Sequence, residues 1–164
     1  MVKRQVFFSF HYDEDNWRAA QVRNMGKVAG NSLLSDNDWE KIRKSNTAIM
    51  QWIDNQMNTR SCLVVLIGSQ TSNRKWIIYE IKKAYELKKG IVGIRVHNLK
   101  DKKGEKSHKG SNPFYNIFNK DRKRLSTFVK VHDPPFSSSK RVYQDIENNI
   151  EQLIETAIAT KGKY

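Results

Sequence analysis

An uninterrupted apolar run, CLVVLIG at residues 62–68, constrains the fold of this chain most. A segment this short, without a polar face and rich in β-branched residues, predicts a strand that is covered on both faces. A helical pattern follows it over residues 72–90, and a second apolar run, IVGIRV, occupies residues 91–96. Apolar strands that alternate with amphipathic helices predict an α/β protein, a flavodoxin-like three-layer sandwich with a central, mainly parallel β-sheet.

The N-terminal part of the chain extends this alternation. RQVFFSF at residues 4–10 predicts a first buried strand, and the spacing of apolar residues after it predicts a helix with Asp15 as its N-cap. Residues 35–58 predict a second helix, because their apolar residues form one stripe. Asp36 or Asp38 is expected to cap that helix.

The C-terminal part predicts a loop, a strand and a helix. Residues 97–125 have no sustained period and many turn formers, which is typical of a long basic loop. STFVKVHD at residues 126–133 predicts a fourth strand, and residues at about 140–160 predict a last amphipathic helix. We find no internal repeat, so we expect one domain over residues 1–164.

Composition places the chain among soluble globular proteins. Apolar residues make up 38% of the sequence and charged residues 29%, and no stretch approaches the roughly 18 consecutive apolar residues of a membrane helix. The start of the chain is predicted to be a strand and not a signal peptide. Cys62 is the one cysteine and lies in a strand pattern, so we expect a small buried side chain and a cytoplasmic location.

The net charge of +13 is concentrated in one part of the sequence. Residues 82–141 hold 17 Lys or Arg and 5 Asp or Glu, which predicts a positive surface for a nucleic acid, a phosphate-bearing small molecule or an acidic partner. A solvated lysine-rich face is the alternative. Phe114, Tyr115 and Phe118 lie together beside a proline, so we expect them to pin the basic loop to the body. Nucleic-acid binding is therefore the less favoured interpretation.

Two common kinds of site are not supported by the sequence. Asp13, Glu14 and Asp15 invite comparison with phosphoacceptor receiver domains, but the strand at 62–68 ends without the aspartate that such domains need. Helix capping and solvated charge explain the three acids better. The four histidines lack a recognisable ligand spacing, so we expect no metal, and the chain contains no Gly-rich phosphate loop.

Glu80 is the acidic residue with the greatest chemical interest. Parallel sheets carry their sites beyond the carboxyl ends of the strands, and Glu80 lies on the helix that starts there. Trp76 and Glu80 share a helix face beside the core stripe of Ile77 and Ile81, so the carboxylate could lie in a partly dry cleft. The alternative is a surface ion pair with Lys83.

The residues around the first strand and the third predicted helix carry a family resemblance. VFFSFHY and VLIGSQTSNRKWIIYEI together resemble the TIR-like domains of the Thoeris anti-phage defence system. The shared plan is a first strand ending in Phe-x-Ser-aromatic and a Trp-x-x-x-Glu helix after a Ser-bearing strand end. The resemblance extends through the basic loop to Asn-Pro-Phe, over roughly residues 3–118.

The resemblance implies a TIR-like, flavodoxin-like fold and an activity on NAD⁺ as substrate, without a separate cofactor. The bond between nicotinamide and ribose is broken, and the ADP-ribose part becomes a signalling nucleotide, often cyclised. By resemblance, Glu80 is expected to be the catalytic residue. The residues expected to bind the substrate are Phe7, Ser9, Phe10, His11, Ser69 and Trp76.

The resemblance also implies partners. The nucleotide signal would reach a separate effector protein by diffusion, a phage-derived trigger would start the reaction, and a homo-oligomer could complete the site. No membrane is expected to take part. The alternative is a TIR-like protein-interaction module without catalysis, a role that many TIR-type domains have.

Overall fold

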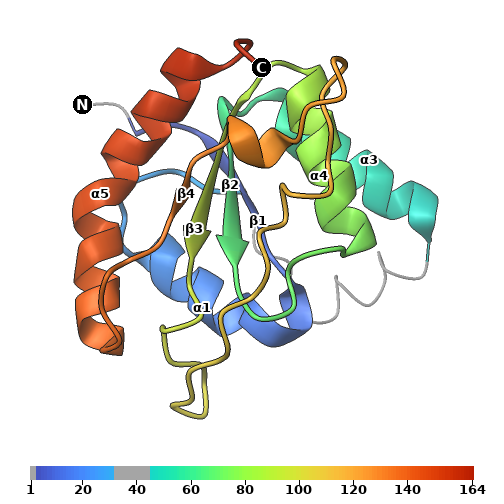
Figure 1. Ribbon diagram of the computed structural model, residues 1–164. Coiled ribbons are helices and arrows are strands. Elements are labelled where there is room, and N and C mark those ends of the chain that lie inside the picture. Colours follow the sequence, from blue (N-terminus) through green and yellow to red (C-terminus); the bar gives the residue numbers. More distant parts are fainter. Residues whose placement is uncertain (1–2, 32–44) are drawn as a thin grey trace.

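The computed structural model describes residues 3–31 and 45–164, whose strands form one parallel sheet (Figure 1). The strands follow the order β1-β2-β3-β4 and all pair in parallel, as predicted. Their bounds are β1 Val6–Ser9, β2 Cys62–Ile67, β3 Gly90–Arg95 and β4 Val131–His132. A single parallel bridge from Gln5 to Ala29 adds a neighbour on the free side of β1, which completes a flavodoxin-type order.

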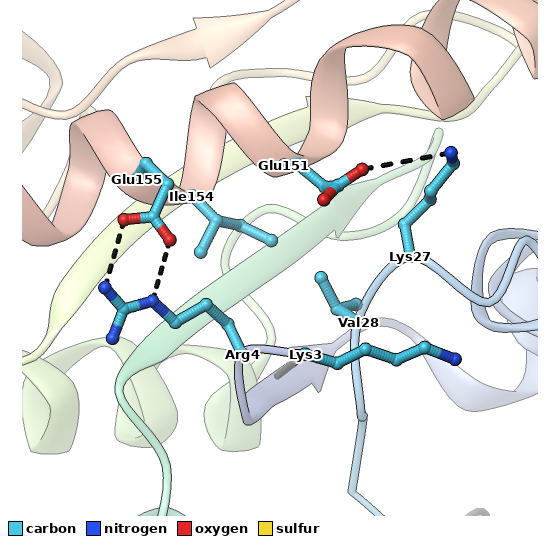
Figure 2. Close-up of a pocket in the computed structure, with 7 residues that line it drawn as sticks. All are labelled: Lys3, Arg4, Lys27, Val28, Glu151, Ile154 and Glu155. Atoms are coloured by element: carbon cyan, nitrogen blue, oxygen red, sulfur yellow. Dashed lines mark hydrogen bonds and ion pairs between the residues drawn. The ribbon is translucent and has the colours of Figure 1, made fainter. Parts of the chain in front are cut away.

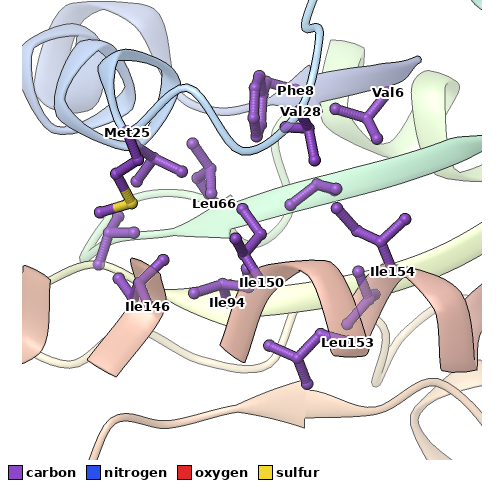
Figure 3. Packing of buried hydrophobic residues seen from close by; sticks show 14 of the residues in the cluster. Val6, Phe8, Met25, Val28, Leu66, Ile94, Ile146, Ile150, Leu153 and Ile154 are labelled. Atoms are coloured by element: carbon purple, nitrogen blue, oxygen red, sulfur yellow. The ribbon is translucent and has the colours of Figure 1, made fainter. Parts of the chain in front are cut away.

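Helices cover both faces of this sheet. Their bounds are α1 Tyr12–Asn24, α3 Asn46–Asn58, α4 Lys75–Glu86 and α5 Ser139–Thr160. One buried cluster joins the sheet to α1 and α5, and Figure 3 shows part of it, with Leu66 and Ile94 facing Ile146 and Ile150. The other cluster joins the opposite face to α3 and α4. The predicted three-layer arrangement is therefore confirmed.

Two predicted helix starts differ from the structure. Helix α1 begins at Tyr12 and its N-cap is His11, whose Nδ1 accepts a hydrogen bond from the Glu14 amide at 3.3 Å, so the prediction of Asp15 as N-cap is wrong. Ser45 has an extended backbone and caps α3, so the predicted helix does not run through this point. Asp36 and Asp38 lie outside the described residues.

The fourth strand is much shorter than predicted. Leu125–Thr127 form a 3₁₀ helix, and β4 contains two residues beside Gly93 and Ile94 of β3. The last helix lies where the sequence predicts it. Residues 97–124 contain no α-helix, as expected, and an antiparallel bridge joins Phe118 to Arg124.

The two strands at the centre of the topology send their helices to opposite faces. Helix α1 follows β1 on one side of the sheet, and α4 follows β2 on the other. Such a reversal opens a crevice beyond the carboxyl ends of the two strands, which is where ligands bind in open α/β sheets. Ser9 ends β1 and Gly68 follows β2, so the fold directs attention to this edge.

Candidate active site

A hydrogen bond between Ser9 and Glu80 forms the centre of the candidate site. Alternate side chains of β1 face opposite sides, so Phe7 and Ser9 both point toward the layer of α3 and α4. Ser9 Oγ lies 2.8 Å from Glu80 Oε1 and donates to it. Both side chains are buried, and Glu80 is 7% exposed. The last residue of β1 thus contacts a carboxyl group on α4 inside the protein.

Burial changes the acidity of this carboxyl group. Loss of solvent raises the pKa of Glu80 from 4.5 to about 8, and the hydrogen bond from Ser9 opposes part of that rise. The surface ion pair that we considered for Glu80 is wrong, because Lys83 instead lies 3.8 Å from Asp54 of α3. A carboxyl group whose pKa lies near neutral pH can take up or release a proton at physiological pH.

The turn from β2 into α4 has a fixed backbone. The amide of Gly68 donates to Thr71 Oγ1 at 2.8 Å, and the Thr71 side chain is fully buried. Asn73 adopts a left-handed backbone with φ of 65°, immediately before Arg74 caps α4. The sequence analysis did not single out Thr71, although its place in the turn, four residues after the end of β2, is typical of a side chain that bonds the backbone.

A buried ion pair lies beside this turn. Arg18 NH1 is 2.9 Å from Asp15 Oδ1, and neither side chain has any exposed surface. The other carboxylate oxygen, Asp15 Oδ2, is buried without a partner, and a Cβ on Gly68 would stand 2.1 Å from it. Burial raises the pKa of Asp15 to about 6, against the influence of Arg18. The prediction of a solvated acidic cluster is therefore wrong for Asp15.

The same arginine holds the basic loop in place. Arg18 donates to the carbonyl oxygens of Leu99 at 2.7 Å and of Glu105 at 2.9 Å. Arg95 donates to the carbonyl of Gly110 at 2.6 Å, and a Cβ on Gly110 would stand 2.1 Å from the carbonyl oxygen of Gly68. Residues 97–112 therefore fold back against the turn that follows β2, and they form one wall of the strand-end edge.

Two predicted contacts lie on the α1 side of this edge. Phe10 is half-buried, packs against the cluster under α1 and α5, and stacks on Tyr12 with 6.5 Å between ring centroids. His11 caps α1, and burial lowers the pKa of its imidazole, which favours the neutral form. Both residues follow Ser9 directly in the chain, but neither forms a hydrogen bond with Glu80.

The other predicted contacts are divided between the edge and the core. Ser69 is half-buried in the turn after β2. Trp76 is half-buried on α4 and packs edge-on against Tyr79, with centroids 5.9 Å apart. Phe7 has no exposed surface and packs edge-on against Trp52 of α3. Phe7 therefore packs in the core between β1 and α3. Its ring would have to become exposed to contact a ligand directly.

A separate hollow lies at the other edge of the sheet, where β1 begins (Figure 2). It measures about 190 Å³ and is lined by Lys3, Arg4, Lys27, Val28, Glu151, Ile154 and Glu155. Its charges are largely paired with each other, because Arg4 contacts Glu155 at 2.7 Å and Lys27 contacts Glu151 at 3.8 Å. This pocket contains none of the predicted site residues.

Over residues 3–31 and 45–164, no three His, Cys, Asp or Glu side chains gather as a metal site would require. Within the same ranges no helix is long and apolar enough to cross a membrane.

The parallel sheet, the helices on both of its faces and the buried carboxyl group at its strand-end edge define an α/β domain of the TIR-like class. A family model described as "Thoeris protein ThsB, TIR-like domain" matches residues 7–101, which include most of β1 and all of β2 and α4, with Glu80. The chain belongs to this family.

One curated relative and two solved structures can be compared with the chain. A protein of Bacillus cereus (strain MSX-D12) with the name "Putative cyclic ADP-D-ribose synthase ThsB1" is 42% identical over 120 residues, which cover 70% of this chain and 62% of the relative. A phosphoheptose isomerase from Francisella tularensis (11% identity, 96% of this chain and 77% of the other) superposes with a TM-score of 0.48. A Clostridium botulinum CMP N-glycosidase, BcmB, gives 0.43 (14% identity, 88% and 98% coverage). At these scores the solved structures carry no argument about function.

Proposed function

We propose that this chain cleaves NAD⁺ as an ADP-ribosyl cyclase or NAD⁺ nucleosidase and makes an ADP-ribose-derived signalling nucleotide for anti-phage defence. The chain spans 62% of the Bacillus cereus relative, whose name supports cyclic ADP-ribose synthesis. The observation that carries the proposal is the buried Glu80 carboxyl group, which accepts a hydrogen bond from Ser9 at the strand-end edge of the sheet.

The proposed role of Glu80 is to stabilise the positive charge that develops on the ribose during the reaction. When the bond between nicotinamide nitrogen and ribose C1′ breaks, the electron pair leaves with nicotinamide and the ribose becomes an oxocarbenium ion. A carboxylate beside that carbon stabilises the positive charge and orients the ribose hydroxyls. An internal nucleophile or water then forms the new bond to C1′, and a proton is released if water or a hydroxyl group attacks.

The raised pKa of Glu80 is compatible with this role. The Glu80 carboxyl group is largely protonated near neutral pH, because its pKa is about 8. NAD⁺ brings a positively charged nicotinamide ring, and a nearby positive charge favours the carboxylate form. Substrate binding would thus release a proton and generate the charged group where the reaction needs it.

The remaining contacts are proposed from position. Ser9 orients Glu80, while Ser69 and His11 offer polar groups at the same edge. Phe10 and Trp76 would supply apolar walls for a flat ring. Arginine and lysine side chains near the strand ends would hold the pyrophosphate in place of a Gly-rich loop.

The test is mass spectrometry of small molecules from cells that express the wild type, Glu80→Gln or Glu86→Gln, with and without phage. Glu86 is an exposed glutamate on the same helix, so Glu86→Gln is the matched control. We expect NAD⁺ loss and an ADP-ribose-derived species with the wild type and the control, and neither with Glu80→Gln. Equal nucleotide profiles for all three proteins during infection would support the interaction module instead.

The proposed signal needs further partners. The diffusible nucleotide would activate a separate effector protein, and a phage-derived trigger would start synthesis. A homo-oligomer could complete the crevice beside Ser69. Phage infection is included in the test because the isolated protein would otherwise be assayed without its trigger.

A further inference from the structure

Residues 114–125 form an ordered hairpin outside the candidate active site. The amide of Leu125 donates to the Ile117 carbonyl at 2.8 Å, and the amide of Asn119 donates to the Lys123 carbonyl at the same distance. The buried side chain of Asn119 accepts two further backbone bonds, from Asp121 and Lys123. The turn is thus built by hydrogen bonds, and its side chains are held in defined directions.

The hairpin is fixed to the body by a few buried side chains and runs along α4. Phe114, Ile117 and Leu125 are buried in the cluster between the sheet and α4. The amide of Lys120 donates to the hydroxyl oxygen of Tyr85 near the end of α4, at 3.3 Å. The expectation that aromatic residues pin this segment is therefore confirmed for Phe114.

Two aromatic rings of the hairpin point outward instead. Tyr115 is 53% exposed and Phe118 is 49% exposed, so the expectation that they also pin the loop is wrong. The guanidinium carbon of Arg124 lies 4.0 Å from the centroid of the Tyr115 ring and 5.0 Å from that of Phe118. Arg124 NH1 also donates to the Tyr115 carbonyl at 2.7 Å. Two exposed rings and a guanidinium group thus form one continuous π surface.

Positive charge surrounds this surface. Lys120, Arg122 and Lys123 are exposed in the turn, and Asp121 is the single acid between Phe114 and Leu125. Exposed rings that can stack on bases, flanked by cations that can neutralise phosphates, are the two components of single-stranded nucleic-acid binding. The sequence argument against a nucleic acid required all three rings to pack inward, and Phe114 alone does so.

We propose that the 114–125 hairpin is a binding surface for single-stranded nucleic acid, with bases on Tyr115 and Phe118 and phosphates on the basic side chains of the turn. A uniformly acidic protein would satisfy the cations but would leave the exposed ring faces without a matching flat partner. Single strands offer unpaired base faces, whereas the bases of a duplex are already stacked on each other. The surface is separate from Glu80, so binding does not depend on NAD⁺ cleavage.

The test is fluorescence anisotropy of the full chain with a labelled oligothymidine, measured over a series of salt concentrations. Tyr115→Leu combined with Phe118→Leu removes the rings without changing charge, and Arg124→Gln removes one cation from the hairpin. Lys102→Gln is the charge-matched control, because Lys102 is exposed in another turn. Circular dichroism checks that each variant is folded.

We expect the ring variant to weaken binding on the order of tenfold to a hundredfold, from the usual contribution of base stacking to single-strand affinity. Arg124→Gln should weaken binding and reduce its salt dependence, while Lys102→Gln should leave affinity nearly unchanged. The proposal is overturned if oligothymidine does not bind, or if loss of the rings has no effect and Lys102→Gln weakens binding as much as Arg124→Gln. If polyglutamate competes with oligothymidine, and the ring variant weakens the binding of both to the same extent, the proposal is also overturned, in favour of an acidic protein partner.

Discussion

The hydroxyl group of Ser9 donates to the Glu80 carboxyl group over 2.8 Å, and this bond favours the charged form of a group that burial drives toward neutrality. Ser9→Ala should therefore raise the pKa of Glu80 above about 8 and reduce nucleotide production in infected cells. Ser9→Thr keeps a hydroxyl group and should retain more activity. Carbon-13 NMR titration of the glutamate carboxyl groups measures the pKa. An unchanged value in Ser9→Ala would show that the hydroxyl group has no influence on the ionisation.

The buried carboxyl group also makes stability depend on pH. The folded protein holds the Glu80 proton up to a pKa of about 8, whereas an unfolded glutamate loses it near 4.5. The stabilisation relative to the ionised state is complete below 4.5 and is lost as pH rises toward 8, by at most about 1.4 kcal/mol per pH unit. Glu80→Gln has no proton to lose at this position. The unfolding free energy of this variant should therefore increase relative to that of the wild type as pH rises from 4.5 to 8.

Urea denaturation at several pH values between 5 and 8 measures this difference. Asp15 also has a raised pKa, about 6, but it is present in both proteins and cancels in the comparison. Glu86→Gln, at an exposed position on α4, should follow the wild type at every pH. A constant difference between Glu80→Gln and the wild type would mean that Glu80 ionises in the fold as it does in the unfolded chain.

The sheet was predictable because its strands are apolar on both faces. Burial of every residue in β2 and β3 leaves a sequence pattern that few other structures share. The length of the fourth strand was not predictable. Only Val131 and His132 pair with β3, and a 3₁₀ helix lies before them in the chain. A β-branched segment has the same local preference in either case, and tertiary contacts decide its length.

The site was predictable only in part. Strand-end position and helix spacing drew attention to Glu80, and the family resemblance gave it the expected role, but none of these could show that Lys83 turns toward Asp54. Asp15 looked like a surface acid because three acids lie in a row. Its burial depends on Arg18, which also donates to the nearby Glu14 carbonyl and to the carbonyls of Leu99 and Glu105, far along the chain. Partners at such separations leave no local pattern in a sequence.

Arg18 should therefore be among the most sensitive polar residues of the fold. Arg18→Met would leave a buried carboxylate without its partner and would remove the guanidinium donor from three carbonyl groups, at a cost of about 3–5 kcal/mol. Arg18 lowers the pKa of Asp15, so in Arg18→Met that pKa should lie above the wild-type value of about 6. The deficit should therefore shrink as pH falls toward 6. Asp15→Asn combined with Arg18→Met removes the charge as well and should be less destabilised than Arg18→Met alone. Urea denaturation of the three proteins measures this, and an unchanged midpoint for Arg18→Met would refute the argument.

The contact between Gly110 and Gly68 predicts how the basic loop is held over the strand ends. A Cβ on Gly110 would stand 2.1 Å from the backbone oxygen of Gly68, and neither backbone can move without disturbing the loop or the turn. Gly110→Ala should lower the unfolding free energy by about 1–3 kcal/mol. It should also weaken the hydrogen-exchange protection of the Ser107 amide, which donates to the carbonyl of His97.

Gly104→Ala is the control for this substitution. A Cβ there would meet nothing within 4 Å, so the left-handed backbone, with φ of 78°, accounts for its whole cost of about 1–2 kcal/mol. That variant should lose stability without exposing the Ser107 amide. If Gly110→Ala leaves the protection of Ser107 intact while Gly104→Ala reduces it, the loop is held by its own turn at residues 101–104 and not by its contact with Gly68.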